Sequence, residues 1–130
     1  MNLRPALVAR VYATADALRE RHPELRSALT WDGFRSVLSR EGVLLARVPL
    51  GRPAKLMGYE GTWIILVDSD RPARHLGFAL HEFGHLKMHV DDGPNGRYEQ
   101  CFHMDDLLAD DPRELEADLL AELLVYGWER

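Results

Sequence analysis

The sequence predicts a small α+β domain in which helices flank a short sheet. Three observations support this fold class. Residues 1–42 contain two helical patterns, residues 43–68 contain three short runs rich in aliphatic and aromatic residues, and two further helical patterns follow at 72–90 and 112–127. A chain of 130 residues can bury one hydrophobic core, so we expect a single domain over residues 1–130.

The helical N-terminal part should contain two helices. The first is predicted over residues 3–21, because the residue before Pro23 avoids the helical conformation. The second is predicted over residues 30–40, with Thr30 as a good N-cap and Gly42 as its C-terminal stop. The apolar positions of the first helix recur three to four residues apart: Leu7, Val8, Val11, Ala15 and Leu18.

Two short helices joined by a turn also occur in DNA-binding domains. In this region Arg35 and Arg40 are offset by Asp32 and Glu41, and the whole chain has a formal net charge of -5. A surface that binds nucleic-acid phosphates needs a basic stripe. We therefore expect no direct binding of nucleic acid.

The middle of the chain predicts three strands, over residues 43–48, 54–59 and 62–67, separated by turns that contain Pro and Gly. Short connections of this kind favour a three-stranded antiparallel meander. The third strand is continuously apolar from residue 63 to residue 67, so we expect it to be central or covered on both faces.

The next helix, predicted over residues 72–90, carries the motif His81-Glu82-x-x-His85. Residues four apart lie on one face of a helix, so both imidazoles can bind a single ion. Neutral imidazole is a common ligand of Zn²⁺, which is the expected ion, with Mn²⁺ as the alternative. Glu82 lies about 100° further round the helix, where its carboxylate can serve as general base toward a water at the metal.

A catalytic zinc site takes three protein ligands, so a third one has to be found. His89 lies roughly 12 Å from His81 along a straight helix, which is too far for one tetrahedral ion. We expect His89 to cap the helix end or to contact the ligands from outside. Asp91 lies where some zinc sites place a third ligand, but the glycine that turns the chain in those sites is replaced here by Met88.

The last helix, predicted over residues 112–127, is mostly apolar, and this sets its few acidic residues apart. Glu114 and Asp118 share one face, so Glu114 can bind the metal while Asp118 accepts a hydrogen bond from a ligand imidazole. Glu116 points in another direction and is the competing ligand. Small residues where the two helices should approach each other are Gly84, Ala117 and Ala121.

Residues 74–89 and 114–124 resemble the two motif helices of the ImmA/IrrE family of metallopeptidases. The first motif of that family is an apolar helix containing His-Glu-Leu-Gly-His, often with a later His. The second is a helix of the form Glu-x-x-Ala-Asn-x-Phe-Ala. This chain departs from the second motif at Asp118, where Asn is usual, and at Leu120, where Phe is usual.

The resemblance implies a zincin-like domain of the gluzincin kind. It implies that His81 and His85 bind zinc, that Glu82 is the catalytic base and that Glu114 is the third ligand. It also implies a function: a cytoplasmic zinc endopeptidase that cleaves and so inactivates a helix-turn-helix repressor of the Xre type, as part of a stress response or the control of a mobile element. The alternative is a non-catalytic, metal-containing binding module that sequesters such a repressor.

A peptidase also needs a donor that stabilises the oxyanion of the transition state. Residues 91–111 form a long, acidic segment between the two motif helices, and long loops of this kind are often functional. The candidates that it offers are Arg97, Tyr98 and His103.

The remaining features of the sequence bear on location. No apolar run is long enough to span a membrane, and the first ten residues lack the apolar stretch of a signal peptide. The single cysteine, Cys101, cannot form an intramolecular disulfide, which fits a reducing compartment. We expect a cytoplasmic protein without a membrane partner.

Overall fold

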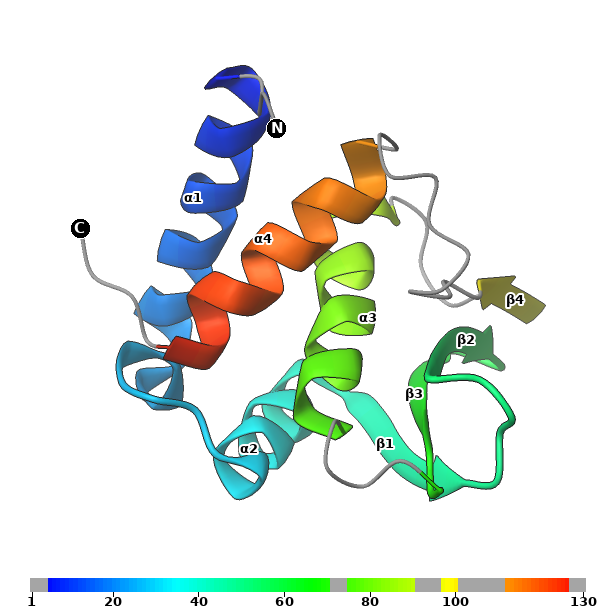
Figure 1. The fold of residues 1–130 in the computed structure, drawn as a ribbon. Helices are drawn as coiled ribbons and strands as arrows, with labels where there is room; N and C mark the ends of the chain where they lie inside the picture. Colours follow the sequence, from blue (N-terminus) through cyan, green and yellow to red (C-terminus); the bar gives the residue numbers. More distant parts are fainter. Residues whose placement is uncertain (1–4, 71–74, 91–96, 101–111, 127–130) are drawn as a thin grey trace.

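The computed structural model describes residues 5–70, 75–90, 97–100 and 112–126. For residues 97–100 it describes the backbone alone. It is an α+β structure (Figure 1). The helices and strands follow one another as α1 (Pro5–Arg21), a 3-10 helix (Pro23–Arg26), α2 (Trp31–Glu41), β1 (Val43–Val48), β2 (Ala54–Tyr59), β3 (Thr62–Asp68), α3 (His75–His89), β4 (Arg97–Gln100) and α4 (Pro112–Tyr126). Within the described ranges, the predicted helices and strands are all present, with shifts of a few residues at their ends.

The ends of α2 form as the sequence predicts. Thr30 adopts an extended backbone conformation, and its side-chain oxygen accepts a hydrogen bond from the backbone N–H of Gly33 at 3.0 Å. At the other end, Gly42 is in the left-handed conformation with φ 73°, and its N–H bonds back to the carbonyls of Leu38 and Ser39. This conformation is one that residues with a side chain rarely adopt.

The sheet differs from the predicted meander in the position of β1. Its strands lie in the order β1-β3-β2-β4 in the described part of the chain. The β2–β3 hairpin is antiparallel, with Ala54 opposite Val67, and β3 is central, as predicted. The prediction is wrong for β1, which pairs with β3 in parallel, from Val43 opposite Trp63 onward.

The two connections explain this difference. Glu60 and Gly61, between β2 and β3, both have positive φ values, 49° and 83°, as in the tight turns that join antiparallel neighbours. The five residues 49–53 between β1 and β2 include two prolines and do not form such a turn. They allow β2 to pass to the far side of β3, whose continuous apolar run suits the central position.

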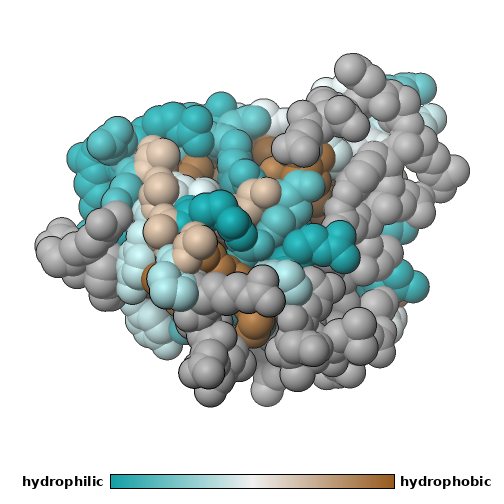
Figure 2. Space-filling model, turned by 90° about the horizontal axis from the view of Figure 1, so that it is seen from above, coloured by the Kyte–Doolittle hydropathy of each residue, from teal (hydrophilic) through white to brown (hydrophobic). Residues whose placement is uncertain are grey.

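Helix α3 lies between α4 and the sheet (Figure 1) and contacts both. Ten of its fifteen residues are buried, namely His75 and all of those from Phe78 to Leu86. Phe83 meets Phe34 of α2 edge to face, with ring centroids 5.7 Å apart. In the view from above (Figure 2), the described residues on the surface are mainly hydrophilic, with smaller hydrophobic areas between them. A helix buried to this extent keeps its polar side chains out of water, so they need partners within the protein.

None of the helices that the structure describes has both the length and the apolar character needed to cross a lipid bilayer.

The predicted close approach of α3 and α4 is confirmed at Gly84. A Cβ atom added there would lie 3.3 Å from both the Cα and the carbonyl oxygen of Ala117. Both of these are backbone atoms, so α4 itself would have to move to accommodate a methyl group. The glycine therefore allows the two helices that carry the motif residues to pack closely.

We expect Gly84→Ala to lower the free energy of unfolding by about 1–3 kcal/mol, because it overpacks this contact. Gly77→Ala is the matched control, since Gly77 is on the same helix and a Cβ there would meet nothing within 4 Å. The control should stabilise the protein by up to about 1 kcal/mol through helix propensity. Urea denaturation of both variants measures the difference, and equal effects would show that the contact at Ala117 is not tight.

Candidate metal centre

Two histidines of α3 form the first part of the candidate site. His81 and His85 are one helical turn apart, as predicted, and only 2% and 0% exposed. Their Nε2 atoms are 3.1 Å apart, and their rings are nearly perpendicular, with centroids separated by 4.7 Å. Two imidazole nitrogens that face the same point inside the protein are suited to bind one ion.

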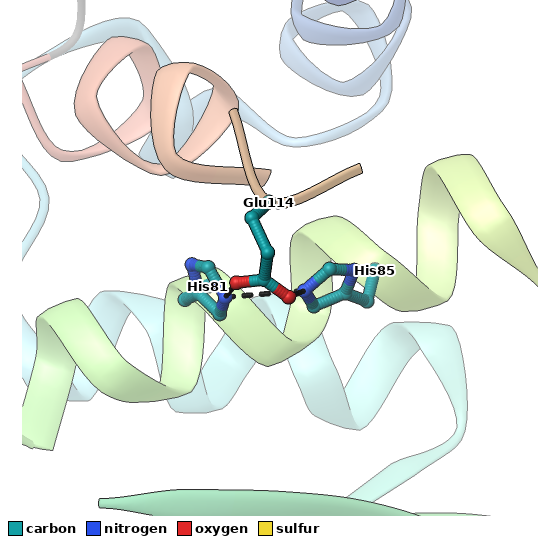
Figure 3. A group of neighbouring side chains, drawn as sticks. All are labelled: His81, His85 and Glu114. Atoms are coloured by element: carbon teal, nitrogen blue, oxygen red, sulfur yellow. Dashed lines mark hydrogen bonds and ion pairs between the residues drawn. The ribbon is translucent and has the colours of Figure 1, made fainter. Parts of the chain in front are cut away.

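The first turn of α4 supplies the third member. The Glu114 carboxylate extends toward the two rings (Figure 3), with Oε2 3.0 Å from Nε2 of His81 and Oε1 3.1 Å from Nε2 of His85. One ligand atom from each of the three residues lies within 4.8 Å of the others, and all three residues are buried. This group could hold a metal ion, and two imidazoles with one carboxylate are a donor set found in catalytic zinc sites.

The competing ligand, Glu116, lies outside this group. Its Oε2 accepts hydrogen bonds from Nε and Nη2 of Arg10, at 3.1 and 2.6 Å, and its Oε1 lies 3.2 Å from Nε2 of His89. The carboxylate is buried, with 6% of its side chain exposed. Of the two alternatives, Glu114 is therefore the residue placed to bind a metal. No local pattern in the sequence marks Arg10 as the partner of Glu116, because 106 positions separate the two residues.

The hydrogen bond predicted for Asp118 is present. Its Oδ1 lies 2.7 Å from Nδ1 of His81. Burial by itself would lower the pKa of His81, but the hydrogen bond to Asp118 and the negative charges of Asp118, Glu114 and Glu82 outweigh burial, so the pKa is raised. With its Nδ1 proton held by Asp118, a neutral His81 presents a bare Nε2 to the other ligands.

His85 has the opposite electrostatic environment. Burial, with smaller contributions from His81, His89 and Arg113, lowers its pKa to about 2, so the ring stays neutral. Its Nδ1 is 2.9 Å from Nδ1 of His89, so His89 contacts a member of the group from outside it, as predicted. A neutral imidazole is the form that binds metals.

The predicted base, Glu82, is fully buried beside the ligands. Neither of its carboxylate oxygens makes a hydrogen bond to a side chain in the described part of the protein. Burial raises the pKa of Glu82 to about 8. The charge of His81 and the hydrogen-bonding effect of the Leu56 backbone act to lower this pKa, whereas the negative charge of Glu114 raises it further. Buried carboxylates usually have partners, so this arrangement costs stability and calls for a functional explanation.

The candidates for oxyanion stabilisation remain predictions. Arg97 and Tyr98 belong to β4, where Tyr98 pairs with Gly58 and Arg97 with Tyr59 of β2. His103 lies outside the described residues, as does Asp91.

No protein-family model, curated protein or solved structure matches this chain. The family resemblance therefore rests on the residues of the two motif segments and stays a prediction.

Proposed function

We propose that this chain is a zinc-dependent endopeptidase. The observation that carries the proposal is that the two buried glutamates at the site have different surroundings. Glu114 lies in one group with His81 and His85, whereas Glu82 lies beside them without a described side-chain partner. A purely structural zinc site usually has four protein ligands and needs no additional carboxylate. Three ligands with a separate base are the arrangement that metal-assisted hydrolysis requires.

The residues fit zinc, and each can be given a role in peptide hydrolysis. Bound zinc would supply a Lewis acid that polarises the scissile carbonyl and favours deprotonation of the attacking water. Glu82 accepts the proton of that water on a carboxylate oxygen and later delivers it to the leaving amine nitrogen. A nearby cation favours the ionised carboxylate, so the pKa that burial raises would fall again when zinc binds. Asp118 keeps the proton of His81 on Nδ1 throughout.

The proposed substrate is a helix-turn-helix repressor of the Xre type in the cytoplasm. This part of the proposal is supported by the resemblance of the two motif helices to the ImmA/IrrE family. A substrate segment would bind in extended form along an edge of the sheet, where backbone groups can form hydrogen bonds with another strand. Cleavage would then inactivate the repressor, with no contact between this protein and DNA.

The proposal is tested by incubating the purified protein with a candidate Xre-type repressor and identifying products by mass spectrometry. We expect defined fragments in the presence of zinc, none after treatment with a chelator, and fragments again when zinc is restored. Release of intact repressor from its operator DNA, without fragments at any zinc concentration, would contradict hydrolysis and favour the sequestering module.

A further inference from the structure

A chain of contacts leads from the surface of α1 to the ligand His85. Arg10, whose side chain is 61% exposed, binds Oε2 of Glu116 through two nitrogens. The other oxygen of Glu116 lies 3.2 Å from Nε2 of His89, and Nδ1 of His89 lies 2.9 Å from Nδ1 of His85. The three inner side chains are each at most 9% exposed, so these contacts are shielded from water.

The protons in this chain can be assigned from the requirement that His85 bind a metal. Its Nε2 faces Glu114 and His81, so this is the nitrogen that would bind the metal. Nε2 must therefore be unprotonated, and the proton of the neutral ring must be on Nδ1. His85 then donates to Nδ1 of His89, which leaves the proton of a neutral His89 on Nε2. That proton is donated to Oε1 of Glu116, since a carboxylate oxygen accepts hydrogen bonds.

We propose that Glu116 is a positioning residue for the metal centre, acting on His85 through His89, and that Arg10 fixes the orientation of its carboxylate. The inference rests on the proposed metal site and extends it. Each histidine ligand then has its Nδ1 proton held: His81 by Asp118 directly, and His85 by Glu116 through an intervening imidazole. Such outer contacts set the tautomer and the ring orientation of a ligand.

The competing explanation is that Arg10 and Glu116 simply join α1 to α4. Glu41, another glutamate that bridges two helices and is mostly shielded from solvent, provides the matched control. It binds His22 at 2.7 Å and also Lys87 of α3, its side chain is 10% exposed, and it is not a member of the group formed by His81, His85 and Glu114. Loss of its charge should affect stability alone.

The experiment measures Zn²⁺ affinity by chelator competition, together with the visible spectrum of the Co²⁺-substituted protein, for wild type, Glu116→Ala, Glu116→Gln, Arg10→Ala and Glu41→Gln. We expect Glu116→Ala to weaken zinc binding roughly 10–100-fold and to alter the Co²⁺ spectrum. Glu116→Gln keeps the volume of the side chain and should show a smaller loss of the same kind, and Arg10→Ala a smaller one still. Glu41→Gln should bind both ions as wild type does.

A double-mutant cycle tests whether Glu116 acts through His89. In a His89→Ala background, Glu116→Ala should produce no further loss of zinc affinity. Additive losses, wild-type affinity and spectrum in Glu116→Ala, or an equal loss in Glu41→Gln would each overturn the proposal.

Failure of the metal site itself is distinguished by the wild-type titration. If wild type binds no zinc, the proposed function fails and this inference fails with it, because the proton on Nδ1 of His85 is assigned from metal binding. If wild type binds zinc, ¹⁵N NMR of the histidines in the zinc-loaded protein tests the inference separately. A proton on Nδ1 of His85 and on Nε2 of His89 would support the contact chain, and a proton on Nδ1 of His89 would refute it.

Discussion

Replacing Glu82 by Gln is expected to abolish peptide cleavage while leaving zinc bound. The side chain is fully buried beside His81 and Glu114 but is not a member of the group of ligand atoms. An amide of the same shape fills the same space and cannot accept the proton. General-base catalysis typically contributes about 10²–10⁴-fold, so the rate of cleavage should fall by at least two orders of magnitude.

The measurement pairs a cleavage assay with the zinc content per chain, so that loss of the base is separated from loss of the metal. Asp70→Asn provides a control substitution, because Asp70 is an exposed carboxylate outside the site. Cleavage at the wild-type rate by Glu82→Gln would refute the assignment of the base. Equal release of an intact repressor from DNA by wild type and Glu82→Gln would support sequestration in place of hydrolysis.

The same substitution should stabilise the metal-free protein, by an amount that depends on pH. Burial raises the pKa of Glu82 in the folded protein from its ordinary value of 4.5 to about 8. Between these values the unfolded chain releases a proton that the folded protein keeps, so wild type loses stability as pH rises, by at most about 1.4 kcal/mol per pH unit. Glutamine does not titrate, and this contribution to the slope disappears.

Urea denaturation in the presence of chelator measures this effect. The free energy of unfolding of Glu82→Gln should exceed that of wild type by about 2 kcal/mol or more at pH 8, and by much less at pH 5. Equal pH slopes for the two proteins would show that Glu82 is not held in a desolvating environment. A buried general base is expected to lower stability when the metal is absent and to be required for activity when the metal is present.

The candidate site could be predicted from the sequence largely because its information is local. The spacing of His81 and His85 defines a helical face on its own. On the last helix, Glu114 and Asp118 stood out because they are acidic residues one turn apart in a mostly apolar segment. The close contact of Gly84 with Ala117 followed from the same reasoning about small residues.

What could not be predicted depends on contacts between distant segments. The pairing of β1 with β3 is not encoded in either strand, since an apolar run does not specify the direction of its neighbour. Arg10 lies on an amphipathic helix where any exposed arginine has the same local pattern. Its contact with Glu116 depends on the packing of α1 against α4, which lie side by side (Figure 1).

Removing the Glu114 carboxylate should release the metal. The binding free energy of zinc at structural sites is on the order of 10 kcal/mol. Loss of one ligand in three should therefore weaken binding by about 3 kcal/mol, which is more than a hundredfold in affinity. We expect one zinc per chain in wild type and substoichiometric zinc in Glu114→Ala, measured by mass spectrometry after dialysis against a weak chelator. Glu116→Ala should retain zinc under these conditions, because Glu116 reaches His85 only through His89 and its removal is expected to weaken binding by no more than about a hundredfold.

Glu122→Ala is the control for this series, since Glu122 is exposed on the same helix. Glu114→Gln accompanies Glu114→Ala, because it keeps the side-chain volume and separates loss of the ligand charge from damage to the α3–α4 contact. If Glu116→Ala lost its zinc and Glu114→Ala kept it, the last helix would have to be rotated so that the other glutamate faces His81 and His85. Zinc in neither variant, with normal thermal unfolding of both, would mean that both carboxylates hold the centre together: Glu114 as a ligand and Glu116 through the histidine that it orients.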